Sequence, residues 1–303
     1  MKKFLIVIAG PTASGKTALA IELALLLKTE IISADSRQFF KEMNIGTAKP
    51  TAGQLKKVKH HFINSLSVKE DYNAGAFETD ALKKLEQIFS SHDVAILAGG
   101  SGLYIDAVCN GFDRLPEHDE NIREELSVLF KTKGIRALQE KLKNLDSEYY
   151  NTVDLNNTHR VMRAIEVCLL TGKKFSELRS RSKANRNFSV IKIGLSVDRK
   201  ILYERINERV DQMMRDGLLE EVKQLFMFRQ YNALQTVGYK ELFDHLEEKI
   251  SLEEAVELIK RNSRRYAKRQ LTWFKKDKEI CWFPLEDKEK IVAFIRNNLL
   301  GNQ

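Results

Sequence analysis

The chain has 303 residues, of which 43% are hydrophobic and 30% are charged, as in ordinary folded globular proteins. Its net charge of +8 suggests a polyanionic partner without establishing one. The three cysteines, Cys109, Cys168 and Cys281, stand apart in the sequence, which argues against a disulfide framework or a zinc site. Apolar stretches reach only strand length, so we expect a cytoplasmic protein that makes no contact with a membrane.

Strands and helices are expected to alternate through the first part of the chain. Residues 3–9 and 93–98 have the apolar composition of buried strands, and residues 18–28 and 76–90 have helical spacing. This alternation predicts an α/β fold, a P-loop NTPase-like parallel sheet flanked by helices. In such sheets, ligands bind beyond the carboxyl ends of the strands. Shorter strands are expected at residues 30–33, 59–64 and, later in the chain, 189–197.

Three parts of the chain differ in their pattern. Residues 1–112 form the first part of the predicted α/β core. Residues 113–186 contain only helical patterns with charged connections, which predicts an all-helical insertion domain. Residues 187–303 are expected to complete the core and to end in basic, mostly helical segments. No internal repeat or coiled-coil seam is present, so we expect a monomer.

A glycine-rich loop follows the first predicted strand. Its sequence, GPTASGKT, fits G-x-x-x-x-G-K-[ST] between a strand and a helix. Glycines let the backbone amides approach phosphate oxygens closely, and the helix N-terminus favours the same negative charge. The lysine adds a cation and the threonine hydroxyl is a ligand for Mg²⁺. The residues predicted to bind a diphosphate or triphosphate are Gly10, Pro11, Thr12, Ala13, Ser14, Gly15, Lys16 and Thr17.

One feature of nucleotide hydrolases is missing. Those enzymes usually carry an acidic residue at the end of an apolar strand, where it helps to hold Mg²⁺. Here the strand at residues 93–98 runs into Gly99, Gly100 and Ser101 without a carboxylate. Binding of a diphosphate is therefore better supported than transfer of a γ-phosphoryl group.

Asp35 follows the second strand and is the nearest carboxylate to the phosphate loop. Its position is compatible with a general base, a magnesium ligand or a helix N-cap. Two further loops, residues 44–50 and 99–102, offer backbone amides, the Lys49 ammonium group and the Ser101 hydroxyl. Ordinary turn chemistry also accounts for both loops.

Taken together, these motifs resemble the tRNA dimethylallyltransferases, the bacterial tRNA isopentenyl transferase family. The resemblance covers nearly the whole chain. It rests on GPTASGKT at residues 10–17, DSRQ at 35–38, NIGTAKP at 44–50, HHFIN at 60–64, AGGSGLYI at 98–105, HRVMRAIEV at 159–167, VGYKE at 237–241 and YAKRQLTWF at 266–274.

The resemblance implies a reaction and roles for particular residues. A dimethylallyl group would move from dimethylallyl diphosphate to N6 of the adenosine 3′-adjacent to the anticodon in tRNA, releasing diphosphate. Asp35 would be the general base, ionised if its pKa stays near the ordinary value of about 3.9. Lys16, with Mg²⁺ on Thr17, would neutralise the leaving group, and Ser101, where the family usually has threonine, would contact the target nucleotide.

The same resemblance implies a set of tRNA-contacting residues. These are Asp35, Ser36, Arg37, Gln38, Ser101, Arg123, His159, Arg160, Val161, Met162, Arg163, Gln235, Thr236, Val237, Gly238, Tyr239, Lys240, Lys268, Arg269, Gln270, Leu271, Thr272, Trp273, Phe274 and Lys275.

Helical spacing sorts two segments into faces. Val161, Ala164, Ile165, Cys168 and Leu169 form an apolar stripe, with His159, Arg163 and Glu166 on another face. Near the end of the chain, Arg261, Arg264, Arg265 and Lys268 form a cationic ridge suited to RNA phosphates, opposite a buried side made by Ala255, Leu258, Ile259 and Tyr266. Arg205 and Arg209 are compatible with contact to the diphosphate or with pairing to Glu204 and Glu208.

Three other functions fit parts of the pattern. A P-loop kinase acting on a small acceptor would use the phosphate loop without needing the basic ridge. An RNA-binding ATP switch would require the missing strand-end acid. An enzyme that prenylates free adenine nucleotides would not need the helical insertion.

Overall fold

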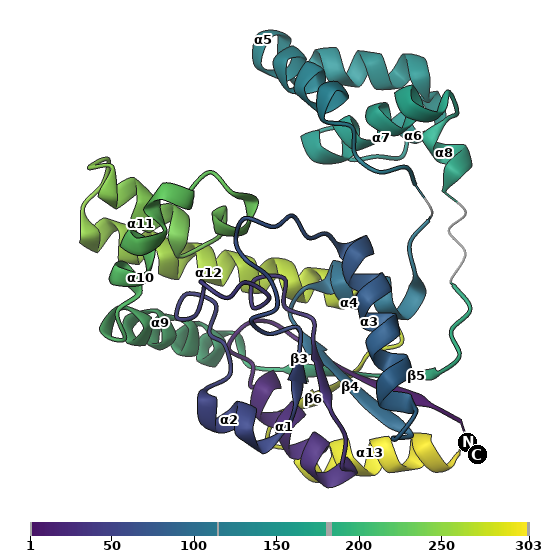
Figure 1. Cartoon of the computed structure of the whole chain (residues 1–303), viewed down its shortest axis with the longest axis vertical. Helices are drawn as coiled ribbons and strands as arrows, with labels where there is room; N and C mark the ends of the chain where they lie inside the picture. The colour runs from purple at the N-terminus through teal and green to yellow at the C-terminus, as the bar shows by residue number, and fades with distance from the viewer. Residues whose placement is uncertain (1, 114, 180–183, 302–303) are drawn as a thin grey trace. The chain divides into compact units, whose positions relative to one another are not determined.

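The computed structural model describes residues 2–113, 115–179 and 184–301. Contacts within the chain divide it into two compact units (Figure 1). The first unit joins Met1–Asn110 to Asn185–Gln303, and the second is Gly111–Ala184. Each unit has its own hydrophobic core. Among the described residues, no helix is both long enough and apolar enough to cross a membrane.

A parallel sheet forms the centre of the first unit. Its strands lie in the order β3-β2-β4-β1-β5-β6, and every pairing is parallel. This arrangement confirms the predicted α/β class. The strands are β1 (Phe4–Ala9), β2 (Ile31–Ser33), β3 (His60–His61), β4 (Val94–Gly99), β5 (Ser189–Ser196) and β6 (Cys281–Pro284).

The sheet differs from the prediction at its two edges. The strand expected at residues 59–64 is reduced to two residues, His60–His61. The edge strand β6 was not predicted, because its sequence, CWFP, is short and ends in proline, which is tolerated mainly at sheet edges.

Helices cover both faces of the sheet, and β1 explains why. Its successive side chains point to opposite faces, and both faces are buried. Leu5 and Val7 belong to a core shared with α3 (Ala74–Phe89) and α4 (Gly102–Asn110). Ile6 and Ile8 pack with α1 (Lys16–Leu27) and α13 (Lys288–Leu300). A fully apolar strand therefore specifies a sheet buried between two layers of helices.

Most of the remaining helices of the first unit form a third core beside the sheet. Phe40 and Met43 from the loop after β2 pack there against Leu218 and Tyr239. The core therefore anchors the segment that follows Asp35. The elements of this core are α9 (Arg199–Arg215), α10 (Leu218–Leu225), α11 (Tyr239–Leu246) and α12 (Leu252–Phe274), with 3₁₀ turns at Phe226–Phe228 and Asn232–Leu234. The short helix α2 (Ala52–Lys57) contributes no residue to it.

The second unit is all helical within its described residues. It contains α5 (Glu120–Leu145), α6 (Ser147–Tyr150), α7 (Thr158–Thr171) and α8 (Phe175–Leu178). Helix α5 is interrupted at Gly134, whose φ of 72° lies in the left-handed region that favours glycine. Leu138 and Leu142 pack against Val161 and Ile165 of α7.

The predicted faces of α7 need two corrections. Leu169 was expected in the apolar stripe, but it is 40% exposed. Glu166 was expected on a polar face, yet only 1% of it is exposed. Spacing assigns residues to common faces, but a buried carboxylate with enough hydrogen-bond donors is stable on an inward face.

Candidate active site

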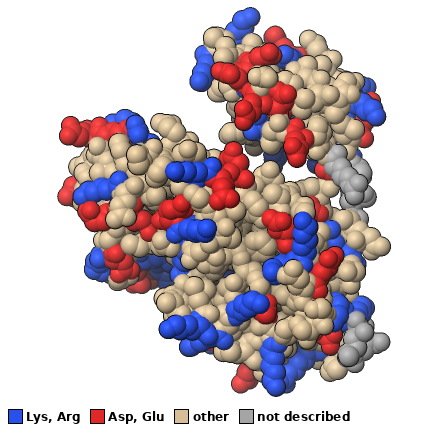
Figure 2. Space-filling view, viewed as in Figure 1, with Lys and Arg blue, Asp and Glu red and all other residues tan. Residues whose placement is uncertain are grey.

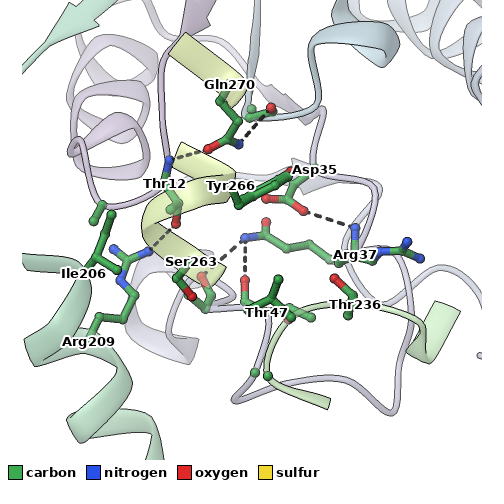
Figure 3. A pocket seen from close by; sticks show the side chains of 18 of the residues that line it. Thr12, Asp35, Arg37, Thr47, Ile206, Arg209, Thr236, Ser263, Tyr266 and Gln270 are labelled. Atoms are coloured by element: carbon green, nitrogen blue, oxygen red, sulfur yellow. Dashed lines mark hydrogen bonds between the residues drawn. The ribbon is translucent and has the colours of Figure 1, made fainter. Parts of the chain in front are cut away.

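A cavity of about 920 Å³ opens at the carboxyl end of the sheet (Figure 3). Its walls come from the phosphate loop, the segment after β2, the loop at residues 44–50, and helices α9 and α12. Every one of these elements belongs to the first unit. The cavity thus lies where parallel α/β sheets bind their ligands.

The phosphate loop has the backbone shape needed to hold an anion. Ala13 and Gly15 have φ values of 63° and 94°, and α1 begins at Lys16. Residues 12–17 all line the cavity, whereas Gly10 and Pro11 lie at the base of the loop and do not. The Ser14 hydroxyl is buried and has no hydrogen-bond partner among the described residues. An unpartnered buried hydroxyl in this loop indicates a missing polar ligand.

Lys16 is the cation at the centre of the loop. Its Nζ donates a hydrogen bond of 2.6 Å to the Pro11 carbonyl oxygen. Burial lowers the pKa of Lys16 to about 8, with Asp35 opposing the shift and Arg209 adding to it. Among the described residues, no carboxylate forms an ion pair with this ammonium group, so its charge is available to an anionic ligand, which would in turn favour the protonated form.

Arg209 of α9 adds a second cation to the same place. Its Nη1 donates to the Thr12 Oγ1 at 3.2 Å, and burial lowers the pKa of Arg209 (Figure 3). The sequence left Arg205 and Arg209 undecided between diphosphate and neighbouring acids. The structure places Arg209 in the cavity wall, together with Ile206, which lies about one helical turn earlier in α9.

Asp35 faces the cavity from the turn that follows β2. Its Oδ1 accepts a 3.1 Å hydrogen bond from the Arg37 backbone N–H, and no helix begins at this turn. The helix N-cap alternative is therefore excluded. Burial raises the pKa of Asp35, while the Arg37 N–H and the charge of Lys16 work against the rise. The carboxylate is thus a stronger base than the unperturbed group expected from the sequence.

Ser101 reaches the site through Ser36. The Ser101 Oγ accepts from the Ser36 N–H at 3.0 Å and donates to the Ser36 Oγ at 3.2 Å. Ser101 is 9% exposed and contributes no direct wall to the cavity.

Tyr266 of α12 is a lining residue that the sequence assigned wrongly. It was expected on the buried side of the helix, yet it is 37% exposed and lines the cavity near Asp35 (Figure 3). The cavity wall desolvates the phenol group and so raises the pKa of Tyr266 to about 12, and the charge of Asp35 adds to the rise. The phenol therefore stays neutral at physiological pH.

Several residues of the loop at residues 44–50 line the cavity, but Lys49 does not. Gln38 holds this loop by donating from Nε2 to the carbonyl oxygens of Thr47 and Ala48. Lys49 was a candidate for phosphate binding. Instead, its Nζ donates to the Phe40 carbonyl oxygen and to the side chains of Asn44 and Asn64.

The predicted tRNA segments divide into cavity-lining, surface and buried residues. Residues 35–38, 235–238, Lys240, Arg269 and Gln270 line the cavity. Lys268, Thr272 and Trp273 are exposed on α12, and Lys275 is exposed directly after it. Three expectations are corrected: the side chains of Val161, Tyr239 and Phe274 are buried in hydrophobic cores, so they stabilise the fold and cannot touch RNA. Leu271 also packs in a core, beside Ala267.

The cationic ridge on α12 is split in two. Arg261 and Arg265 line the cavity, but Arg264 turns to α9, where its Nη1 donates to the Asn207 Oδ1 at 2.6 Å. On the face shown in Figure 2, basic and acidic side chains are interspersed rather than gathered in one patch. The cations that line the cavity are therefore more informative than the total charge.

Within the second unit, Arg163 is held by the buried carboxylate of Glu166. Arg163 Nη1 donates to the Glu166 Oε2 at 2.8 Å, and the Arg123 Nε lies 3.2 Å from Oε1. Arg123, His159 and Arg160 are exposed, and Met162 is half-buried. The two arginines come from different helices, and the carboxylate brings them to one place.

These features define a class of protein: an α/β protein whose phosphate loop shares one cavity with two half-buried cations and with an aspartate whose pKa is raised. The family model described as IPP transferase matches residues 38–277. The chain belongs to the IPP transferase family.

Bacteria contain proteins that are similar over nearly the whole chain. The chain is 52% identical to a tRNA dimethylallyltransferase of Christiangramia forsetii over 96% of both chains. It is 51% identical to a tRNA dimethylallyltransferase of Flavobacterium johnsoniae over 98% of both chains.

Two solved structures share the fold. One is a tRNA isopentenylpyrophosphate transferase of Bacillus halodurans, 36% identical over 100% of both chains, with a TM-score of 0.72. The other is a eukaryotic dimethylallyltransferase acting on tRNA, 26% identical over 99% of this chain and 80% of that one, with a TM-score of 0.80.

Proposed function

We propose that this protein transfers a dimethylallyl group from dimethylallyl diphosphate to N6 of the adenosine 3′-adjacent to the anticodon in tRNA. The products are N6-dimethylallyladenosine and diphosphate. One observation carries the proposal: the phosphate loop and Asp35 line the same cavity, and the charges of Lys16 and Asp35 perturb each other's pKa. A cation for a leaving diphosphate and a base for an incoming amine are thus neighbours.

The diphosphate belongs in the loop at residues 12–17. Lys16 and Arg209 supply the positive charge that stabilises the leaving group as its carbon–oxygen bond breaks. Thr17 lines the cavity, and no group of three or more His, Cys, Asp or Glu among the described residues forms a metal cage. This donor set fits Mg²⁺, which binds through few protein ligands together with phosphate oxygens and water. When bound at Thr17, Mg²⁺ would neutralise charge on the diphosphate.

Asp35 receives the proton that the adenosine amine releases. The N6–carbon bond forms as the carbon–oxygen bond breaks, and the bonding electrons leave with the diphosphate. The amine lone pair is delocalised into the purine ring, so loss of its proton must accompany attack. Because its pKa is raised, the Asp35 carboxylate accepts that proton more readily than an exposed aspartate would.

The RNA would approach the cavity wall formed by α12. Arg261, Arg265 and Arg269 line this side of the cavity and suit backbone phosphates. Further along the helix, Trp273 is 36% exposed and offers a stacking surface for a base. The target base must leave the anticodon stack to meet Asp35. Arg123, His159, Arg160, Met162 and Arg163 of the second unit are proposed as additional tRNA contacts. We place the enzyme in the cytoplasm as a monomer.

The test combines purified protein, Mg²⁺, dimethylallyl diphosphate and unmodified tRNA, followed by mass analysis of the digested nucleosides. The expected product is a dimethylallyl-adenosine that disappears with Asp35→Ala. If the protein prenylates free adenine nucleotides but not tRNA, its substrate is a free nucleotide and not an RNA. Formation of ADP from ATP, with no prenylated nucleoside, would instead support a kinase.

A further inference from the structure

Gln270 of α12 connects two loops that carry different parts of the site. Its Oε1 accepts a 2.8 Å hydrogen bond from the Thr12 backbone N–H, and its Nε2 donates to the Gly100 carbonyl oxygen at 2.9 Å (Figure 3). The first loop follows β1 and the second follows β4. These bonds fix the orientation of the amide, because an N–H group requires an oxygen acceptor and a carbonyl requires a donor.

The Gln270 amide is buried and packs tightly against Gly100. Gln270 is only 6% exposed. A Cβ atom at Gly100 would lie 2.2 Å from the Gln270 Nε2, so a side chain at this position would displace the amide. Burial with both ends of the amide engaged argues against the tRNA contact expected for Gln270 from the sequence.

Each end of this bridge continues into functional groups. On the diphosphate side, the Thr12 hydroxyl accepts from Arg209. On the nucleotide side, Gly100 precedes Ser101, whose hydroxyl is bonded to Ser36 beside Asp35. Gln270 therefore lies in the middle of a series of contacts. The series runs from Arg209, which would bind the diphosphate, to the segment that carries Asp35, the proposed general base.

We propose that Gln270 is a positioning residue. It holds the diphosphate-binding loop, residues 10–17, and the loop at residues 99–102, which would contact the target nucleotide, at a fixed distance and orientation. This inference rests on the proposed function. Group transfer requires the reacting atoms to stand about 3–3.5 Å apart, and a misplacement of about 1 Å lowers the rate about 100-fold. A single amide bonded to both loops prevents such a displacement without touching either substrate.

Two substitutions separate the two bonds. Gln270→Met keeps the length of the side chain and loses both hydrogen bonds, whereas Gln270→Glu keeps the acceptor for Thr12 and loses the donor to Gly100. Gln270→Met should lower kcat by about 10- to 100-fold and raise KM for both substrates. Gln270→Glu should raise KM mainly for tRNA. Gln224→Met, on the exposed surface of α10, is the matched control.

A double-mutant cycle tests whether Gln270 carries coupling and not merely stability. Arg209→Gln and Ser101→Ala change the two ends of the series. Their effects on kcat/KM should depart from additivity by about threefold or more in the presence of Gln270 and become additive with Gln270→Met. Equal non-additivity in both backgrounds, or unchanged KM values in Gln270→Met, would overturn the proposal.

Binding measurements distinguish this inference from the proposed reaction. Calorimetry with inorganic pyrophosphate, with and without an unmodified anticodon stem-loop, measures coupling without chemistry. The stem-loop should change the pyrophosphate affinity of the unsubstituted protein by about fivefold or more, and Gln270→Met should abolish the change. Coupling that survives in Gln270→Met would refute the role of Gln270 even if tRNA is prenylated. A protein that binds no stem-loop would refute both proposals.

Discussion

Charged side chains that line the cavity have few charged partners, whereas buried charged side chains elsewhere in the protein, here called the framework, are paired with opposite charges. Lys192 of β5 is 6% exposed and lies 2.7 Å from Asp277 and 2.8 Å from Glu279. Burial alone would lower the pKa of Lys192, but the two carboxylates outweigh it and raise that pKa. Within the described part of the chain, the Lys16 ammonium group has a backbone carbonyl as its sole hydrogen-bond partner, and its pKa falls to about 8.

Two carboxylates, the buried Glu166 and the half-buried Asp35, show the same contrast. Burial works to raise the pKa of Glu166, but hydrogen bonds from Arg163, His118 and the Asp119 N–H outweigh it and lower that pKa. For Asp35, burial raises the pKa, and it outweighs the backbone N–H groups of Arg37 and Gln38 and the charge of Lys16, which work to lower that pKa. A fully partnered charge stabilises the framework. A sparsely partnered charge retains unused capacity for a ligand or a proton, as expected at a functional site.

The largest expected effect is on kcat/KM and comes from removing the Asp35 carboxylate, which has few partners. Asp35→Asn keeps the shape of the side chain and removes the base, so kcat/KM should fall by about 10²–10⁴-fold. The free energy of unfolding should stay equal or rise, because a poorly solvated charge is lost. Initial rates of nucleoside prenylation and urea unfolding measure the two quantities. A rate within tenfold of the unsubstituted enzyme would remove Asp35 from the chemistry.

Removing the fully partnered carboxylate should have the reverse outcome. Glu166→Gln leaves Arg163 without its charge partner and should destabilise the second unit by about 2–3 kcal/mol. KM for dimethylallyl diphosphate should not change. Hydrogen exchange in α5 and α7 under increasing urea measures the loss. The control is Glu177→Gln, whose exposed pair with Lys174 at 4.0 Å should contribute less than about 0.5 kcal/mol.

The pH dependence of pyrophosphate binding tests the two lysines. The Lys16 ammonium group loses its proton as pH rises through about 8, so pyrophosphate affinity should fall above that pH, approaching tenfold per unit. Lys192 should stay charged throughout, because its pKa is raised. Calorimetry between about pH 7 and 10 measures the profile. Lys16→Arg should remove the inflection near 8, and an inflection that persists would assign it to another group.

The smallest expected effect concerns two lysines on the surface of α12. Lys268 is exposed and unpaired among the described residues, whereas Lys260 lies 2.8 Å from Asp211 and 3.1 Å from Glu257. Lys268→Gln should weaken tRNA binding several-fold and reduce the slope of log affinity against log salt by about one. Lys260→Gln should leave that slope unchanged. Equal slopes for both variants would show that Lys268 contacts no phosphate.

Local patterns were enough to predict the sheet and the phosphate loop. The apolar strand at residues 4–9, the loop at residues 10–17 and the helix after it are specified by neighbouring residues. The placement of Asp35 near Lys16 was also predictable, because carboxyl ends of parallel strands meet at one edge.

Long-range packing could not be predicted in the same way. Gln270 meets Thr12 across 258 positions of the chain. Arg209 meets the same residue across 197 positions. Helical spacing showed which residues share a face, but Tyr266 and Glu166 reveal that it did not show what each face meets.

By itself, the sequence of this protein determined most of the elements, the centre of the parallel sheet and the phosphate loop, because these depend on residues close together in the chain. Only the tertiary structure decided which charges are partnered and which are not. Solvation and pKa depend on every group within a few ångströms, and folding brings those groups together from distant positions. That difference separates Lys16 and Asp35, which face the cavity, from Lys192 and Glu166, which hold the framework.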